Sequence, residues 1–263
     1  MVDILLTNDD GYSSIAFYPL LRELSKHFSV ETVAPSTEQS WIGKSLSRST
    51  PLSLVQRTLS EFQIYSLNGT PADCVQIGLY DVLNDKPRLV VSGINKGLNT
   101  GHGRILSSGT VGAAMEASVN GVKSLSVSMH IPEGVRSRDV DKTIFDNAAI
   151  ITASIVKMFI DEPFGESVDL LSVNIPYQAG VDTEIEITSP HRDSYGKLFH
   201  KVGGKYTLIS PPINFSIAKS GTDLGALAAG RISVTPVSLA LFSKKAARKM
   251  QQLFRDKKQS RVL

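Results

Sequence analysis

Two adjacent aspartates follow the first apolar run of the chain, within the sequence Thr7-Asn8-Asp9-Asp10-Gly11. Carboxylate oxygens are ligands that hard divalent cations such as Mg²⁺ and Mn²⁺ prefer. Ligands of open α/β sheets bind beyond the carboxyl ends of the strands, so a carboxylate pair at such an end is typical of a metal site. A turn that caps the following helix accounts for these residues equally well, because Asp and Gly are common in turns.

Two later loops offer further polar groups. The sequence Gly93-Ile94-Asn95-Lys96-Gly97-Leu98-Asn99 follows an apolar run and provides amide oxygens from Asn95 and Asn99. The sequence Ser108-Gly109-Thr110 stands at the start of an expected helix. The free N–H groups and the positive dipole end of a helix N-terminus suit a phosphate. An ordinary Ser/Thr helix cap explains the same residues.

A fourth loop contains Gln39-Ser40 and Gly43-Lys44-Ser45 after another apolar run. Its last three residues resemble the end of a phosphate-binding P-loop, but position 38 is Glu where that motif requires Gly. The Gly-x-Gly pair at 101 and 103 lacks the third glycine of the dinucleotide-binding motif. Trp41, the single tryptophan of the sequence, either packs against a nucleobase or covers its own loop.

Several other chemistries have little support. Cys74 is the single cysteine, which excludes an intrachain disulfide and a cysteine-only metal cluster, and its place in an expected helix favours a buried apolar role. The five histidines lack the His-x-x-x-His spacing of a helical zinc site, and the Gly-x-Ser-x-Gly motif of serine hydrolases does not occur. His102 lies near the candidate site and is either a proton donor or an ordinary loop histidine.

The pattern of apolar residues predicts the elements that carry these loops. Apolar runs alternate with helical patterns over the first 130 residues, which indicates βαβ units and a mostly parallel sheet in an α/β fold. We expect Ser13 or Ser14 to cap the first helix, Met158 to lie on a buried helix stripe, and one face of strand 125–129 to be less buried. The expected strands are 3–7, 30–34, 64–67, 89–91, 125–129, 170–175, 184–188, 205–210 and 231–235, and the expected helices are 17–28, 71–79, 110–119 and 139–159.

Composition and charge narrow the class of protein. The 263 residues are 41% hydrophobic and 20% charged, which excludes a disordered chain and a coiled coil. No run approaches the ~20 apolar residues of a membrane span, and the short apolar N-terminus does not match a secretory signal, so we expect a cytoplasmic protein that does not enter the membrane. Residues 244–263 carry a net charge of +7, against −4 for the rest. This tail is either a solvated helix, which its lack of aromatic residues besides Phe254 favours, or a nucleic-acid-binding segment.

Taken together and in order, five motifs resemble those of the survival protein E (SurE) family. They are Thr7–Gly11, Val33-Ala34-Pro35 with Gln39-Ser40, Gly69–Val75, Val91–Asn95 and Ser108–Ala114. Three later segments are similar to C-terminal motifs of that family, namely Asn174–Pro176, Gly221–Asp223 and Ser233–Pro236. The resemblance covers about residues 2–240, and its ordered motifs are far more specific than any one of them.

The resemblance implies a Rossmann-like three-layer fold with a mostly parallel sheet, a C-terminal β-hairpin and a helical tail used in homodimer or homotetramer assembly. We expect the Rossmann-like catalytic domain over residues 1–180 and a C-terminal elaboration over residues 181–263. The implied activity is that of a divalent-metal-dependent 5′(3′)-nucleotidase, a phosphatase acting on nucleoside monophosphates, with polyphosphate as a further candidate substrate. The implied cofactor is one Mg²⁺ or Mn²⁺ ion per subunit.

The resemblance also assigns roles to residues of this sequence. The implied metal ligands are Asp9, Asp10, Ser40 and Asn95. Asp9 and Asp10 are the implied catalytic pair, with Asp9 the first choice to orient or deprotonate an attacking water. The implied substrate contacts are Asn8, Asn99, Ser108, Gly109 and Thr110.

Other interpretations stay open at this point. A covalent aspartyl-phosphate is the mechanistic alternative to direct attack by water. A non-catalytic nucleotide- or metal-binding protein on the same fold is the functional alternative, because fold alone does not determine function. The sequence departs from the family pattern at Trp41, at Lys44 and around His102, and we expect Lys44 and Arg104 to make the pocket more cationic.

Overall fold

A nine-stranded sheet runs through the computed structural model, which describes residues 2–136, 139–163, 165, 167–192, 195–209 and 211–259. Its strands are β1 (Ile4–Thr7), β2 (Val30–Pro35), β3 (Leu54–Leu59), β4 (Phe62–Leu67), β5 (Leu89–Lys96), β6 (Ser124–Met129), β7 (Leu170–Ile175), β8 (Ile185–Ile187) and β11 (Ile232–Val237). Their order is β3-β4-β2-β1-β5-β6-β7-β11-β8. Neighbouring strands are parallel except in the pairs β3–β4 and β7–β11. The expected α/β fold with a mostly parallel sheet is confirmed.

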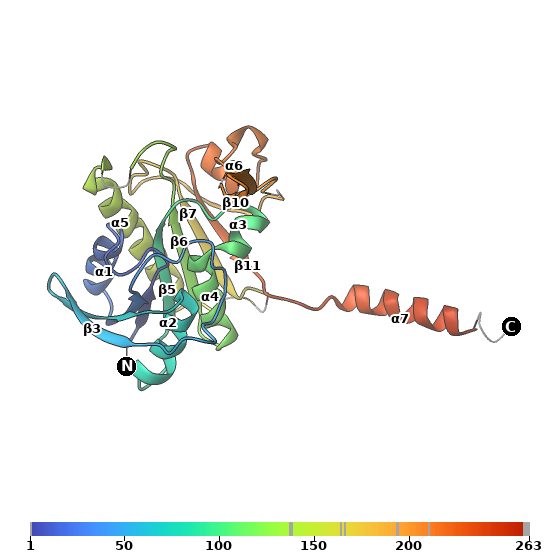
Figure 1. Cartoon of the computed structure of the whole chain (residues 1–263), viewed down its shortest axis with the longest axis horizontal. Coiled ribbons are helices and arrows are strands. Elements are labelled where there is room, and N and C mark those ends of the chain that lie inside the picture. Colours follow the sequence, from blue (N-terminus) through green and yellow to red (C-terminus); the bar gives the residue numbers. More distant parts are fainter. Residues whose placement is uncertain are drawn as a thin grey trace.

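Helices cover both faces of this sheet (Figure 1). On one face lie α1 (Phe17–Ser25) and α5 (Lys142–Phe159), and on the other lie α2 (Pro71–Ile77) and α4 (Gly109–Val119). The alternation of side chains along β1 explains the two layers, because Ile4 and Leu6 pack with α1 and α5 whereas Leu5 packs with α2 and α4. The remaining helices are η1 (Gly78–Val82), α3 (Gly101–Ser107), η3 (Phe215–Ile217), α6 (Asp223–Ala228) and α7 (Lys244–Gln259).

The C-terminal part has the expected hairpin and tail helix. The hairpin consists of β9 (Phe199–Val202) and β10 (Lys205–Leu208), paired antiparallel, and position 210 of the expected strand lies outside the described residues. Helix α7 stands away from the body of the molecule (Figure 1). Strands β8 and β11 continue the main sheet, so the sheet itself crosses residue 180, and the division into two units there stays a prediction. None of the described helices is long and apolar enough to cross a membrane.

Three local predictions are wrong. Helix α1 begins after Ala16 without a side-chain cap, because Ser14 takes part in a turn in which its N–H donates to the Gly11 carbonyl (3.0 Å). Met158 is 50% exposed, because Val156 and Ile160 mark the buried side of the last turn of α5 and Met158 lies opposite. Every residue of β6 is buried, since helices or loops cover both faces of this central strand.

Two of the elements that the sequence pattern did not predict lie next to the candidate site. Strand β3 is polar and largely exposed, because it forms the edge of the sheet and pairs with β4 alone. Helix α3 contains two glycines in seven residues, and its sequence carries no helical stripe. Both elements border the loops that contain the candidate site residues.

Candidate functional site

The loops expected to carry chemistry meet at the carboxyl edge of the sheet. Strands β1 and β5 are parallel neighbours with Thr7 opposite Ser92, so the loops that follow them lie side by side. A cavity of about 530 Å³ opens there, and the helix α4 begins at its edge. Five of the predicted site residues line this cavity: Asp9, Ser40, Asn95, Asn99 and Ser108. The other four, Asn8, Asp10, Gly109 and Thr110, are not among its lining residues.

Asp9 is held from two sides, and only 5% of its surface is exposed. The Thr110 hydroxyl donates a hydrogen bond of 2.6 Å to Asp9 Oδ1. Gly109 lies directly behind it, because a Cβ at that position would stand 2.9 Å from Asp9 Cβ. Burial, and then the neighbouring charge of Asp10, raise the pKa of Asp9 to about 7. The helix start therefore orients this carboxylate, while the surroundings oppose its ionisation.

Asp10 faces a cation that the chain supplies. The Lys96 backbone N–H donates to Asp10 Oδ2 (3.1 Å), and the Lys96 ammonium lies 3.3 Å from Oδ1. Burial raises the pKa of Asp10, and the charge of Lys96 opposes that shift. Two adjacent carboxylates are thus collected in a low-dielectric site with one ammonium group beside them.

The asparagines and serines around the cavity are fixed by local hydrogen bonds. The Asn95 amide donates to the Gly97 carbonyl (2.7 Å), which fixes the orientation of its side chain. The Asn99 amide donates to the Ser128 hydroxyl (2.8 Å), and its backbone N–H donates to the Asn174 side chain. Ser108 caps α4 by accepting from the N–H of residue 111, so its capping role and its place in the lining coexist. The exposed Ser40 hydroxyl donates to Glu38 within its own loop (2.5 Å).

Asn8 closes the turn after β1. Its amide donates to the Gly11 carbonyl (2.9 Å), and Gly11 has the positive φ of 90° that such a turn requires. The side chain is fully buried, and among the described residues its Oδ1 has no hydrogen-bond partner. The aspartates do not cap α1, which has no side-chain cap. The turn therefore serves to aim the aspartates at the edge of the sheet.

This donor set suits a hard divalent cation. Two buried carboxylates repel one another and resist ionisation, and a bound cation relieves both effects. Ser40 and Asn95 line the same cavity, and they offer a hydroxyl oxygen and an amide oxygen. Every candidate ligand atom is therefore an oxygen, which hard divalent cations prefer. Within the described part of the chain, no group of three or more His, Cys, Asp or Glu side chains is placed to hold a metal ion.

The structure adds residues that the sequence reasoning did not select. Lys96 lies in the loop 93–99, which the sequence indicated as a polar site because of Asn95 and Asn99, but its contact with Asp10 was not predicted. His130 follows β6 at the same edge of the sheet, so the rule used for the other loops applies to it as well. The centroids of the His130 and Phe215 rings lie 5.4 Å apart in a T-shaped arrangement, and burial lowers the pKa of His130. The segment 211–215 contributes Pro211, Pro212, Ile213 and Phe215 to the lining, and it carries no recognisable sequence signal.

Four residues that the sequence left open have defined positions. Trp41 lines the cavity, with its ring 5.2 Å from that of Tyr195. Arg104 also lines the cavity and donates to the Pro211 carbonyl (3.2 Å). Lys44 does not line the cavity but pairs with Glu116, so its expected contribution to a cationic pocket is wrong. His102 is exposed, lies outside the lining and contacts the carbonyl of residue 191 through its ring (3.1 Å).

Comparison with known proteins identifies relatives along most of the chain. The family model described as survival protein SurE matches residues 4–197. A protein of Methanocaldococcus jannaschii named 5′-nucleotidase SurE is 40% identical over 200 residues, which cover 74% of each chain. A protein of the same name from Archaeoglobus fulgidus is 34% identical over 252 residues, which cover 90% of this chain and 92% of that relative.

This chain is similar to a solved structure both in fold and in amino-acid sequence. The crystal structure of the SurE protein from Aquifex aeolicus superposes with a TM-score of 0.79 and 32% sequence identity. The match covers 95% of this chain and 99% of the other. The similarity therefore includes the C-terminal half, which the family model covers only in part.

Proposed function

Because the chain belongs to the survival protein SurE family, we propose that it is a divalent-metal-dependent phosphatase that hydrolyses nucleoside 5′- and 3′-monophosphates. The named relatives are 5′-nucleotidases, which supports this reaction class. The observation that carries the proposal is the buried Asp9–Asp10 pair, of which Asp9 lines a cavity of about 530 Å³. Polyphosphate is a further candidate substrate.

The lining of the cavity suits the two parts of a nucleotide. It includes the polar side chains of Asp9, Asn99 and Ser108 and the start of α4, whose free N–H groups favour a phosphate. It also includes the aromatic side chains of Trp41 and Phe215. The volume falls within the range of about 300–1,000 Å³ typical of small-molecule sites. A nucleoside therefore has an apolar surface to occupy while its phosphate reaches the carboxylates.

We assign the metal to Asp9, Asp10, Ser40 and Asn95, with Mg²⁺ or Mn²⁺ as the ion. Such an ion, when bound, neutralises charge on the phosphoryl group and activates water as a nucleophile. Asp9 would orient or deprotonate the attacking water, and the Thr110 hydroxyl fixes one of its carboxylate oxygens. Asn99, Ser108 and the backbone N–H groups at Gly109 and Thr110 contact the phosphate.

The quaternary and cellular context belongs to the same proposal. We expect one metal ion per subunit, assembly into a homodimer or homotetramer through the hairpin and tail, and a cytoplasmic location. The exposed apolar side chains Phe199, Val202 and Tyr206 on the hairpin support a role in assembly, because exposed apolar patches mark interaction surfaces.

The test is phosphate release from a panel of nucleoside 5′- and 3′-monophosphates with Mg²⁺, Mn²⁺ or EDTA. We expect release that needs metal and that falls in Asp9→Asn by about 10²- to 10⁴-fold, the range for loss of a positioned acid–base group. Asp85→Asn is the matched control, because Asp85 is exposed and does not line the cavity. No release from the folded native chain with either metal would contradict the proposal and favour a binding protein on this fold.

A further inference from the structure

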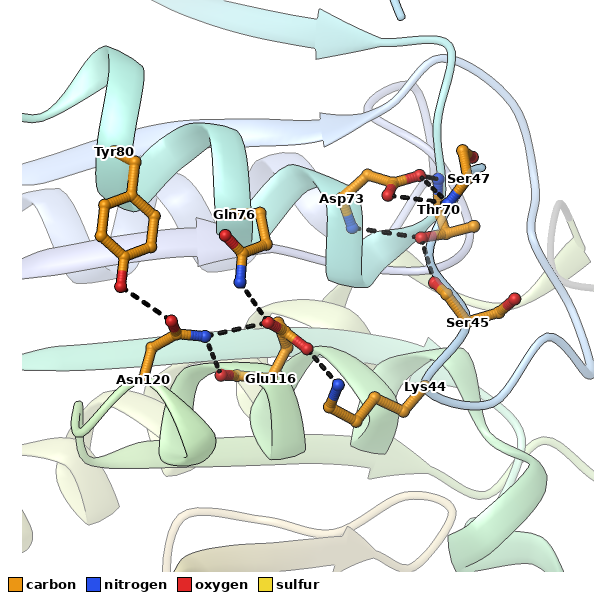
Figure 2. Close-up of polar contacts among 9 residues, drawn as sticks. All are labelled: Lys44, Ser45, Ser47, Thr70, Asp73, Gln76, Tyr80, Glu116 and Asn120. Carbon is orange, nitrogen blue, oxygen red and sulfur yellow. Dashed lines mark hydrogen bonds and ion pairs between the residues drawn. The ribbon is translucent and has the colours of Figure 1, made fainter. Parts of the chain in front are cut away.

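Lys44 follows Ser40 and Trp41 in the same loop. It forms an ion pair with Glu116 (Figure 2). Glu116 belongs to α4 and is 2% exposed, so its charge needs a partner. Gln76 of α2 and Asn120 donate to one carboxylate oxygen, and Lys44 meets the other. Burial by itself raises the pKa of Glu116, but its hydrogen bonds to Lys44 and Gln76 outweigh burial and hold the pKa below its ordinary value.

Residues 43–47 of the same loop contact three helices, α2, α3 and α4. The Gly43 N–H donates to the Ser107 carbonyl (2.9 Å), and a Cβ on Gly112 would lie 2.3 Å from the Gly43 carbonyl oxygen. The Ser45 carbonyl accepts from the Thr70 hydroxyl (2.6 Å), and the Ser47 N–H donates to Asp73 (3.0 Å; Figure 2). Because Thr70 and Asp73 form the capping box of α2, these ties rest on a rigid helix start.

Trp41 needs such support. Its φ of 61° is in the left-handed region, which large residues adopt only where the surrounding structure holds them. Ser40 beside it is exposed, and its side chain bonds within its own loop. On the C-terminal side of Trp41, the Ile42 side chain packs beside Gly109, and the next side-chain contact with a helix is the ion pair of Lys44.

We propose that Lys44 is a positioning residue, whose ion pair with Glu116 holds Ser40 and Trp41 at the cavity. Lys44 does not line the cavity, so it acts through the loop and not by contact with substrate. The effect on nucleotide binding rests on the proposed function, whereas the effect on the loop does not. Loosening the loop weakens substrate binding and, through Ser40, metal binding, while Asp9 and Thr110 stay in place. At saturating metal, KM therefore rises while kcat changes little.

The experiment measures KM, kcat and acrylamide quenching of Trp41, which is the single tryptophan and therefore reports on this loop alone. The variants are Lys44→Met, Glu116→Gln, the double variant and Lys44→Arg. We expect each neutral single variant to raise KM about tenfold with kcat within about twofold, the double variant to do no more than the singles, and Lys44→Arg to restore binding in part. Quenching rises in parallel with KM.

Lys26→Met is the matched control, because Lys26 pairs with Glu23 on α1, far along the chain from the loop. Native quenching and KM in Lys44→Met would overturn the inference. So would a KM increase in Lys44→Met that Glu116→Gln does not share and that leaves Trp41 unmoved, since this result indicates direct contact with substrate. If Glu116→Gln fails to fold, Lys44→Met and Lys44→Arg decide between these outcomes. If the native chain releases no phosphate, the proposed function fails, and the quenching of Trp41 still decides the role of Lys44.

Discussion

At the scale of single residues, the site depends on carboxylates that the fold buries against one another. Asp9 receives one short hydrogen bond from Thr110, and Asp10 receives the ammonium and the N–H of Lys96. Neither interaction removes the cost of placing two adjacent charges in a buried site, and the pKa of both groups is raised. A cation at this position therefore stabilises the folded chain as well as the bound phosphate.

We expect the stability of the metal-free chain to fall as pH rises from about 4 to about 7. The pKa of Asp9 is raised from 3.8 to about 7, so the folded state keeps a proton that the unfolded state loses. The stabilisation that Asp9 contributes to the folded state is complete below the pKa of the unfolded state. It is lost as pH rises through the pKa of the folded state. The measurement is Tm in EDTA across this interval for the native chain and for Asp9→Asn. A difference between the two that does not vary with pH would contradict the assignment.

Thr110→Val removes the hydroxyl that donates to Asp9 and keeps the shape of the side chain. The hydrogen bond from Thr110 lowers the pKa of Asp9, so its loss raises that pKa. We expect the acid limb of the pH–rate profile to move to higher pH and kcat to fall about tenfold, which corresponds to about 1.4 kcal/mol. Thr110→Ser is the control that keeps the hydroxyl. Equal activity profiles for the two variants would exclude this role.

At the scale of elements, α4 organises the site from one end to the other. Its first turn holds Asp9 through Gly109 and Thr110. Its second turn contacts the loop backbone at Gly112, and Glu116 on the next turn pairs with Lys44. A shift of this helix therefore moves Asp9, a proposed metal ligand, and the cavity loop together.

Gly112→Ala tests the contact between α4 and the loop. The added methyl group would lie 2.3 Å from the Gly43 carbonyl oxygen, and backbone atoms on both sides leave no flexible group to give way. We expect overpacking to lower the free energy of unfolding by about 1–3 kcal/mol. Urea denaturation measures it. Gly180→Ala is the control, since no atom lies within 4 Å of its added Cβ, and a similar loss there would show that the effect is not specific to the loop.

At the scale of the whole molecule, the charge and the apolar surface are unevenly distributed. The tail from residue 244 carries the excess of positive charge, and α7 exposes Met250, Leu253 and Phe254 (50%, 46% and 66%) while it stands apart from the body (Figure 1). An exposed amphipathic helix of this kind is typical of an interaction segment. Assembly with further copies is the role that we propose for it, and nucleic-acid binding is the alternative.

Truncation before Lys244 tests both roles. We expect the molar mass in solution, measured by light scattering, to fall, because the truncated protein forms a smaller assembly. The Tm of the body should change little, because its core contains no residue of α7. An unchanged molar mass would argue against a role in assembly. Salt-sensitive binding of an oligonucleotide that disappears on truncation would support the alternative.

The sequence by itself determined the main architecture and most of the strands and helices, because apolar periodicity reflects burial along a continuous segment. It also selected the loops after β1, β2 and β5, since ligand sites of α/β sheets follow strand ends. The division of roles within the site was not accessible in this way. Only the folded chain brings together the segments whose side chains interact there. The interactions are the hydrogen bond from Thr110 to Asp9 and the ion pairs Lys96–Asp10 and Lys44–Glu116.

The part of the cavity lining that comes from the segment 211–215 also depends on the tertiary structure. Residues 211–215 follow Asp9 by about two hundred positions and carry no motif. Buried Asp223 accepts hydrogen bonds from the N–H groups of Gly101 (2.7 Å) and His191 (2.9 Å), which joins the C-terminal segment to the start of α3. A sequence pattern records which residues are apolar or able to turn the chain. Which distant side chains share a cavity, and which charges neutralise one another, is decided by packing.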